Sequence, residues 1–209
     1  MNLITTSELP FASPISGMIH LDYPGIARLN DLTADLGILH LRGPEAENVI
    51  SRFLEDRTKQ DSLVIGESRA LGIFTLCRLA KDEFLILMDN LDELGTIQDR
   101  LAGLASGAHA ALSDLSHGYG KLELVGAGST AVLPRLCGLD FSESGFPNGH
   151  IAQTSLAKVH ATLIHLDGGA GSPRFTILVD RSLSAYAWEV IKAVLQDFKK
   201  ESEGKSQFN

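Results

Sequence analysis

DLTADLGILHLRGPEAENVISRFL (residues 31–54) and DLSHGYGKLELVGAGSTAVLPRLC (residues 114–137) align without a gap, the second segment lying 83 positions after the first. Later in the chain FLILMD (residues 84–89) resembles FTILVD (residues 175–180), now at an offset of 91. We interpret the two matches as duplication of one fold unit. The identical pairs of the longer match are Asp31 and Asp114, Leu32 and Leu115, Gly37 and Gly120, Leu39 and Leu122, Leu41 and Leu124, Gly43 and Gly126, Val49 and Val132, and Arg52 and Arg135.

Both units have the same predicted order of elements. The first contains a strand over 36–41, a helix after Gly43-Pro44, strands over 70–79 and 84–88, and a helix over 91–104. The second contains a strand over 120–125, a helix that Pro134 should bend, an irregular crossing over 137–153, a hairpin of 156–166 with 174–179, and a final helix. This pattern predicts an α+β fold, a duplicated strand-helix-strand-strand-helix unit with a largely antiparallel sheet.

The duplication also suggests the domain organisation. Residues 1–30 should form an N-terminal arm, since three prolines interrupt any long helix there, and part of it could pack on the body. Residues 31–198 should form a single pseudo-symmetric domain made of two repeats, 31–104 and 114–198. Residues 199–209 are polar and contain a glycine, so we expect a disordered tail.

Composition excludes several classes of function. The net charge of −8 is spread along the chain, whereas nucleic-acid binding needs a clustered basic surface. Apolar residues make up 44% of the chain, but no apolar run is long enough to span a membrane, and the N-terminus does not resemble a secretory signal. Cys77 and Cys137 lack metal-ligand spacing and are expected to be reduced core thiols. We therefore expect a cytoplasmic protein that binds neither nucleic acid nor a membrane.

The sequence carries no strong catalytic or metal motif. The histidines lack the spacing of metal ligands, and no serine or cysteine has a nucleophile signature. Gly126-Ala127-Gly128 is expected to be a tight turn, because it lacks the remaining residues of a phosphate-binding loop. Asp31 and Asp114 are candidates for structural turns before a strand, although both are also candidate functional residues. His117, which replaces Ala34 of the first unit, differs in a direction that could be functional.

One irregular stretch is a candidate partner interface. FPNGHIAQ (residues 146–153) combines an aromatic ring, a proline and turn formers, and loops of this kind on rigid scaffolds often carry recognition. We select Phe146, Pro147, Asn148 and Gln153 as candidate contacts. The alternative is that Phe146 fills a gap in the core.

The second repeat resembles a known family. DLSHGYGKLELVG resembles the opening motif of the glycine-cleavage T-protein (aminomethyltransferase) superfamily, whose folate-binding region is a duplicated α+β body. More specifically, residues 110–198 resemble the gamma subunit of heterotetrameric sarcosine oxidase. The matching segments are LCGLDF (136–141), FPNG (146–149), AQTSLAKV (152–159) and RSLSAYAWEVI (181–191). The first half matches more loosely, through LRGPEAENVI and KDEFLIL.

The sequence also departs from the catalytic members of this superfamily. T-proteins carry a catalytic aspartate in a hairpin reading roughly GGVIDDLIVYRL, and here the corresponding stretch is ALGIFTLCRL (residues 70–79), which is shorter and has no aspartate. The further C-terminal domain of T-proteins and the lysine-glycine-cysteine motif of the iron–sulfur-repair branch have no counterpart in the sequence. The resemblance therefore implies a family scaffold with no catalytic residues of its own.

Three functions follow from the resemblance. The first is a non-catalytic, structural or interface subunit of a sarcosine-oxidase-like or N-methyl amino acid oxidising complex, in which larger flavin-binding partner subunits carry flavin and NAD. The second is a free-standing folate-binding, aminomethyltransferase-like protein of one-carbon metabolism. The third is an unassigned binding module of the same fold. The first reading implies that this chain alone binds no cofactor and no metal, although folate remains possible.

Overall fold

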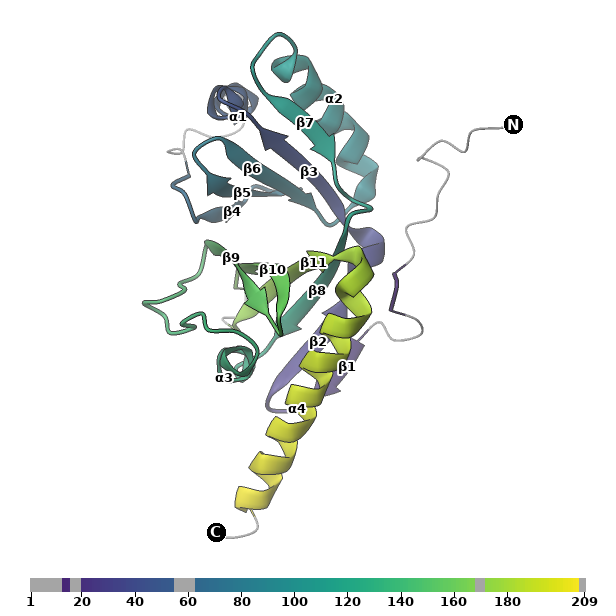
Figure 1. Cartoon of the computed structure of the whole chain (residues 1–209), viewed down its shortest axis with the longest axis vertical. Coiled ribbons are helices and arrows are strands. Elements are labelled where there is room, and N and C mark those ends of the chain that lie inside the picture. Colours follow the sequence, from purple (N-terminus) through teal and green to yellow (C-terminus); the bar gives the residue numbers. More distant parts are fainter. Residues whose placement is uncertain (1–12, 16–19, 55–62, 168–171, 207–209) are drawn as a thin grey trace, which may run out of the picture.

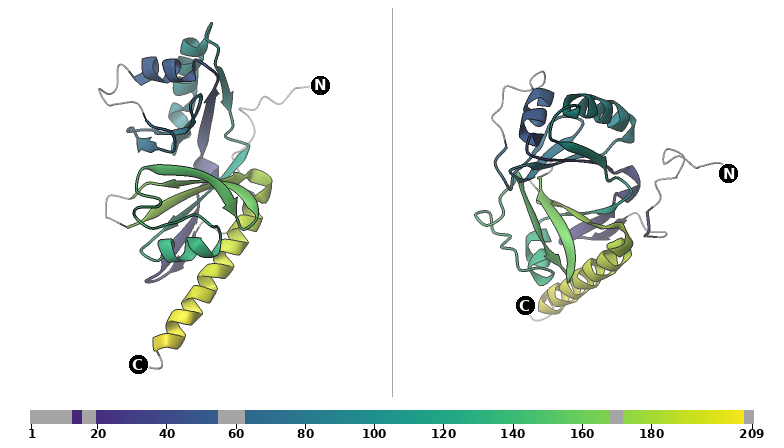
Figure 2. Two further views of the ribbon diagram at one scale, coloured as in Figure 1. Left: turned by 60° about the vertical axis from the view of Figure 1, so that its left-hand side comes forward. Right: turned by 45° about the horizontal axis from the view of Figure 1, so that its top comes forward.

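The computed structural model describes residues 13–15, 20–54, 63–167 and 172–206. Two antiparallel sheets face each other, and the helices lie on their outer sides (Figures 1 and 2). The predicted α+β fold with a largely antiparallel sheet is confirmed. Because each sheet buries both faces, the chain forms three apolar layers: one between the sheets and one under the helices of each half.

The first repeat supplies most of the five-stranded sheet. Its strand order is β4 (Ser68–Ala70), β5 (Thr75–Ala80), β6 (Glu83–Met88), β3 (Gly37–Arg42) and β7 (Ala111–Asp114). Helices α1 (Ala46–Leu54) and α2 (Leu94–Ala105) cover its outer face, and short 3₁₀ turns occupy Thr33–Asp35 and Leu91–Glu93. Alternation along β3 places Leu39 and Leu41 under the helices and Ile38 between the sheets.

The second repeat supplies most of the six-stranded sheet. Its order is β1 (His20–Tyr23), β2 (Ala27–Asp31), β8 (Tyr119–Val125), β11 (Arg174–Asp180), β10 (Val159–His165) and β9 (His150–Leu156). Its outer face packs against α3 (Ser129–Val132) and α4 (Ser184–Ser206). Short 3₁₀ turns occupy Leu133–Arg135 and Arg181–Leu183. The core of this half is centred on Trp188, Phe175 and Leu122, each 0–1% exposed.

The two repeats have the same strand order, and they exchange their first strands. β2 precedes β3 in sequence but pairs with β8, whereas β7 precedes β8 but pairs with β3. Equivalent hydrogen bonds cross the junction in both directions, so neither sheet is complete without a strand that precedes the other repeat. These bonds are Leu32 N to Lys121 O (2.9 Å), Leu115 N to Ile38 O (2.8 Å), Lys121 N to Thr33 Oγ1 (3.0 Å) and Ile38 N to Ser116 Oγ (2.9 Å).

Two of the repeated glycines are explained by this exchange. Gly43 and Gly126 have φ angles of +141° and +139°, in a region that side chains rarely adopt. A Cβ atom on Gly43 would lie 2.3 Å from the carbonyl oxygen of His109, and one on Gly126 would lie 2.7 Å from that of Ile26. His109 and Ile26 are themselves equivalent positions just before the exchanged strands. Both glycines therefore allow an exchanged strand to approach closely.

Three sequence-based boundaries need correction. Residues 20–31 of the predicted arm form β1 and β2, which belong to the six-stranded sheet. The last helix continues to Ser206, past the predicted end at residue 198, and Arg135 bonds Glu201 in this extension at 3.0 and 2.8 Å. Residues 207–209 of the predicted tail lie outside the described residues.

The third correction concerns the predicted irregular crossing. Residues 150–156 form the edge strand β9, which turns into β10 through Ala157 and Lys158. Their φ angles are +49° and +71°, the conformation that a tight hairpin turn requires at its two central residues. Each repeat thus has one more strand after its first helix than predicted, three residues long in β4 and seven in β9.

Candidate functional site

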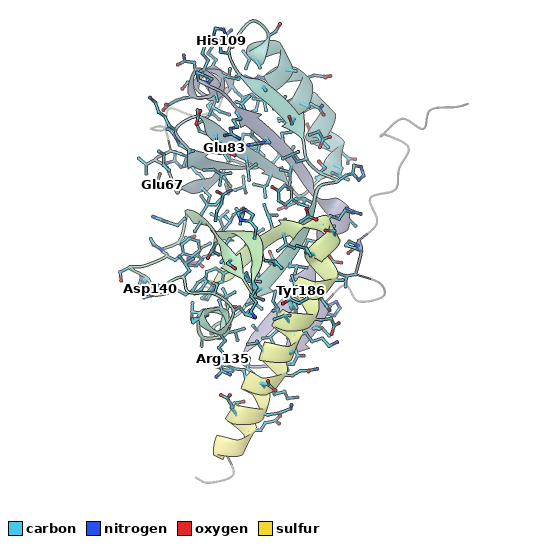
Figure 3. All side chains as sticks on the ribbon, in the orientation of Figure 1. Glu67, Glu83, His109, Arg135, Asp140 and Tyr186 are labelled. Atoms are coloured by element: carbon cyan, nitrogen blue, oxygen red, sulfur yellow. The ribbon has the colours of Figure 1, made fainter. Side chains whose placement is uncertain are left out.

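Within the described part of the chain, a cross-strand ion pair lies on the inner face of each sheet. In the five-stranded sheet, His40 Nε2 lies 2.9 Å from Glu83 Oε1, and in the six-stranded sheet Arg174 Nη1 lies 3.8 Å from Glu123 Oε2. The repeat makes His40 equivalent to Glu123 and Glu83 equivalent to Arg174. The positions of acid and base are therefore reversed between the two halves. Figure 3 labels Glu83 among the strands of the upper half.

A second polar group joins the sheets. The side chain of Lys121 on β8 is only 6% exposed, and its Nζ donates to Asp89 at the end of β6. Beside it, Asn30 Nδ2 donates to Glu123 Oε1 at 3.0 Å. Burying an ammonium group without a partner is costly. The Asp89 carboxylate compensates the positive charge of Lys121 and so stabilises this junction.

The space among these groups is small. The cavity between the sheets has a volume of about 30 Å³ and is bordered by Thr75, Asp89, Lys121, Glu123 and Arg174, among others. Pockets for drug-sized ligands typically measure about 300–1,000 Å³. This cavity therefore suits water or a small ion more than a pteridine.

A larger and more open pocket lies at the end of the six-stranded sheet. Its volume is about 530 Å³, and its walls come from the β1–β2 turn, the end of β8 and the start of β11. Arg28 in this pocket bonds to Asp22 at 3.0 Å, and both side chains are at least half exposed. The basic groups here already face acidic ones, so the pocket has a balanced charge and no evident nucleophile.

The predicted turn aspartates have matching contacts. Asp31 Oδ1 accepts a hydrogen bond from Thr33 N at 3.1 Å, and Asp114 Oδ1 accepts one from Ser116 N at 2.9 Å. These bonds hold the turns that lead each exchanged strand into its own repeat, which is a structural task. His117 lies half-buried in the second of these turns. A functional role for His117 stays a prediction.

The candidate interface residues separate into a buried and an exposed group. Phe146 is 3% exposed, and its ring packs against Phe141 at a centroid distance of 5.9 Å. The prediction that its ring faces a partner is therefore wrong, because the ring fills the outer core of the second repeat. Pro147 is half-buried, while Asn148 and Gln153 are exposed, so only the polar members remain available for contact.

The hairpin between β4 and β5 carries no acid or nucleophile at its tip. Leu71 N donates to Phe74 O at 2.8 Å, and Gly72 adopts a φ of +73° between them. Phe74 is buried under the helices, whereas Ile73 is 46% exposed. This tip occupies the place of the catalytic hairpin that the superfamily resemblance implies, and apolar side chains occupy it.

The thiols and histidines offer little reactive chemistry. Burial raises the pKa of the Cys77 thiol far above its ordinary range, and burial also raises the pKa of Cys137. Both thiols are therefore protonated at neutral pH and poor nucleophiles. Across the described ranges no three His, Cys, Asp or Glu side chains gather as metal ligands, and no helix there is long and apolar enough to cross a membrane.

Sequence reasoning missed the polar groups between the sheets. Their signal was the alternation of β3 and β8, in which His40 and Glu123 occupy equivalent inward positions between buried leucines. Nothing local in the sequence shows that the strands are covered on both faces. Sequence analysis alone therefore predicts that polar residues such as His40 and Glu123 face solvent. The ion pairs themselves follow from the register of β3 with β6 and of β8 with β11, which brings acid and base side chains of neighbouring strands together.

One family profile and two solved structures are similar to this chain. The profile of the sarcosine oxidase gamma subunit family matches residues 62–198. Heterotetrameric sarcosine oxidase from Corynebacterium sp. U-96, in complex with pyrrole 2-carboxylate, has a TM-score of 0.71 and 21% identity, covering 87% of this chain and 89% of that chain. The glycine cleavage system aminomethyltransferase T from Bartonella henselae has a TM-score of 0.63 and 20% identity, covering 82% of this chain and 46% of that chain. A comparison with curated proteins found no match.

The two structural likenesses establish a shared fold, and the profile match adds the family. It begins before β4 and ends at Phe198 of α4, so it includes elements of both repeats. The resemblance seen in the second half of the sequence is thereby confirmed. With well over half of its length matched, this chain belongs to the sarcosine oxidase gamma subunit family.

Proposed function

We propose that this chain is a non-catalytic subunit of a hetero-oligomeric, sarcosine-oxidase-like complex. The observation that carries the proposal is the family match over residues 62–198. The arrangement of the side chains supports it: the hairpin tip that is catalytic in T-proteins carries Gly72 and Ile73, and the inner polar groups are paired with one another. On this proposal flavin and NAD belong to larger partner subunits, and the chain contributes contact surface.

The surface that we propose for the partner surrounds the junction between β4 and β9. Ile151 N donates to Gly66 O at 2.8 Å, which brings the turn over 64–67 next to the start of β9. On this turn Val64 and Ile65 are 60% and 58% exposed, an unusual placement for two neighbouring branched apolar side chains. We call Val64, Ile65, Asn148 and Gln153 the junction surface. It combines two exposed apolar side chains with two exposed amides, and protein interfaces likewise combine apolar and polar groups.

Reconstitution tests the proposal. The chain is co-expressed with the large flavin-binding subunits from the same genome, purified through a tag on this chain, and assayed for sarcosine-dependent oxygen consumption. We expect the large subunits to co-purify and the activity to depend on the complete complex. Turnover of sarcosine by the isolated, flavin-free chain would contradict the proposal, as would complete absence of co-purification.

A matched pair of variants tests the junction surface. Ile65→Asp should weaken capture of the large subunits, because a charge at a desolvated interface has no partner. Ile73→Asp is the control, since Ile73 is also an exposed branched side chain, 46% exposed, but lies at the opposite end of the β4–β5 hairpin. Equal capture of the large subunits by both variants would show that the interface does not include Ile65. Thermal melting of each isolated variant shows that the fold is intact.

Folate binding is a separate question with its own measurement. On the proposed function, isothermal calorimetry with tetrahydrofolate should give weak or no binding, since the cavity that Lys121 and Arg174 border between the sheets measures about 30 Å³. Micromolar affinity would instead support an aminomethyltransferase-like protein. A cytoplasmic location belongs to the same proposal, because Cys77 and Cys137 are both free thiols, the state that a reducing compartment maintains.

A further inference from the structure

Strand β7 has a free edge in the five-stranded sheet. Its described neighbour in the sheet is β3, and its other side lies at the margin of the upper half, beside α2 (Figure 1). Leu115 N donates to Ile38 O at 2.8 Å in the register of β7 with β3, so the odd-numbered residues of β7 face β3. The backbone N–H and C=O groups of Leu112 and Asp114 therefore point outward, where no described strand pairs with them.

The equivalent edge of the second repeat is occupied. β2 is the counterpart of β7, and the repeat continues through both strands, since ARLNDL (residues 27–32) matches AALSDL (residues 110–115) at the same offset of 83. β1 pairs with the outer side of β2 in antiparallel orientation, with Leu21 opposite Leu29. Among the described strands, the six-stranded sheet thus has one more than the other sheet, and its extra position corresponds to the free side of β7.

The apolar layer under α2 is incompletely covered at the same edge. In the second repeat Leu29 is 0% exposed, and Leu21 and Tyr23 of β1 pack against the same core. Leu112, the equivalent of Leu29, is half-buried at the border of the core under α2. An apolar side chain added beside Leu112 would remove this surface from water. Outward-facing backbone groups and a partly covered apolar row therefore coincide at one edge.

We propose that the free edge of β7 accepts one extended strand of a partner subunit. This inference rests on the proposed function, which supplies the partner. An edge strand presents N–H and C=O groups that can pair with another chain, and strand addition of this kind draws its affinity from main-chain hydrogen bonds. The partner strand runs antiparallel to β7 and bonds to Leu112 and Asp114, in the place that β1 takes beside β2.

The side chains of β1 indicate what kind of strand fits. Its outer positions are the apolar Leu21 and Tyr23, and a partner strand needs apolar side chains at the same alternate positions. On the inner face, Asp22 of β1 pairs with Arg28 at 3.0 Å. The equivalent of Arg28 on β7 is Ala111, so an acid on the partner strand would have no cation opposite it. The edge therefore fits a strand that alternates apolar side chains with uncharged polar ones.

A second copy of this chain fits the edge less well. Asp114 lies on the same face of β7 as Leu112, and its carboxylate already accepts from Ser116 N at 2.9 Å. Antiparallel pairing of two β7 strands through their outward groups would set each Asp114 carboxylate opposite an apolar residue or the other Asp114. Such an arrangement is unfavourable for a carboxylate.

Leu112→Pro and Leu112→Ala form a matched pair of variants. Proline removes the outward donor and is tolerated on an edge strand whose N–H faces solvent, so pairing with β3 should persist. Alanine removes the same side chain but keeps the N–H group. In titrations with the large flavin-binding subunits, the dissociation constant of Leu112→Pro should be roughly tenfold higher than that of Leu112→Ala. Thermal melting of each isolated variant checks that it is folded.

Amide hydrogen exchange at single residues is a second readout, and it uses the wild-type chain alone. In the isolated chain Ser113, whose N–H faces β3, should be protected, whereas Leu112 and Asp114 should exchange freely. In the purified complex with the large subunits, protection of Leu112 and Asp114 should rise roughly tenfold or more.

The outcomes separate this inference from the proposed function. A complex that forms while Leu112 and Asp114 stay unprotected would overturn the strand addition and leave the proposed function standing, as would equal affinity of the two folded variants. Failure to form any complex would overturn both. Protection of Leu112 and Asp114 already in the isolated chain would also overturn the strand addition, because a second copy or another segment of the same chain would then occupy the edge.

Discussion

The two repeats keep the same strand order but differ wherever they face away from their shared junction. α1 is a nine-residue helix, whereas its counterpart α3 has four residues and continues as a 3₁₀ turn at Pro134. α2 has 12 residues and α4 has 23. At the junction, by contrast, equivalent hydrogen bonds and equivalent glycines recur. The difference teaches that the exchange of strands constrains sequence strongly, while the outer helices and edge strands are free to change.

The largest expected effect comes from the glycines that admit the exchanged strands. Gly43→Ala and Gly126→Ala should each destabilise the chain by about 4 kcal/mol or more, since the new Cβ meets a backbone carbonyl that can move only with its strand. Urea unfolding measures both. Gly103→Ala on α2 is the control, because its Cβ meets no atom within 4 Å, and it should stabilise by up to about 1 kcal/mol. A mild effect at only one of the two glycines would break the equivalence of the repeats.

Truncation of Phe146 should have the next largest effect. Its ring is 3% exposed and packs against Phe141 and Phe175, so Phe146→Ala should cost roughly 3–4 kcal/mol through lost burial and a residual cavity. Gln153→Ala on the exposed side of β9 serves as the reference and should change stability little. Chemical unfolding of both variants decides between a core and a surface role. If Phe146→Ala melts at the same temperature as the wild type, the ring is not part of the core, and Phe146 becomes a candidate interface residue again.

A smaller effect is expected at the ion pair between Arg78 and Glu47 in the first repeat. In the second repeat the position equivalent to Glu47 is Thr130. Arg78, 7% exposed, bonds Glu47 through Nη1 and Nη2 at 2.8 Å each. These hydrogen bonds lower the pKa of Glu47. Because the Glu47 side chain is 42% exposed, solvent screens the pair, and Glu47→Gln should cost only about 1 kcal/mol at neutral pH.

The pH dependence of this pair has a defined sign. A carboxylate with a lowered pKa in the folded state contributes stability above its unfolded pKa and loses it as the pH falls through the folded value. The stability difference between wild type and Glu47→Gln should therefore be full at neutral pH and shrink below about pH 4. Unfolding curves recorded across this range measure it. A difference that stays constant to acidic pH would show that the side chain acts through packing alone.

The smallest effect is expected at the end of α4. Arg135 bonds Glu201 through two contacts and stacks over Phe198 at 4.8 Å, while its equivalent Arg52 is exposed on α1 (Figure 3 labels Arg135). Arg135→Gln should increase fraying of the last turns of α4 and change global stability little, and added salt should reduce the difference. Amide exchange over residues 199–204 measures the fraying. Amide exchange that does not change in Arg135→Gln would show that this helix end is stable without the contacts of Arg135.

Much of the fold was predictable because it rests on local patterns. The alternation of β3 and β8, the glycine after each strand and the apolar stripe of the last helix were sufficient for the α+β unit and its duplication. β9 was missed because the motif FPNG before it signals a turn, and because a hairpin turn formed by Ala157 and Lys158 has no glycine or asparagine to mark it. The interface prediction failed at Phe146 for a related reason, since burial of a ring depends on the rings that it meets.

By itself, the sequence determined that there are two equivalent units, which faces of their strands are apolar, and where the backbone must be glycine. Those properties follow from side-chain periodicity and from steric limits that act within a few residues. Only the tertiary structure decided that β2 and β7 exchange sheets, that Lys121 meets Asp89, and that His165 faces two acceptors. The edge of a sheet accepts any strand of suitable register, and a buried charge is set by whichever partner lies across the core. Both depend on contacts between residues far apart in the chain, which local pattern does not specify.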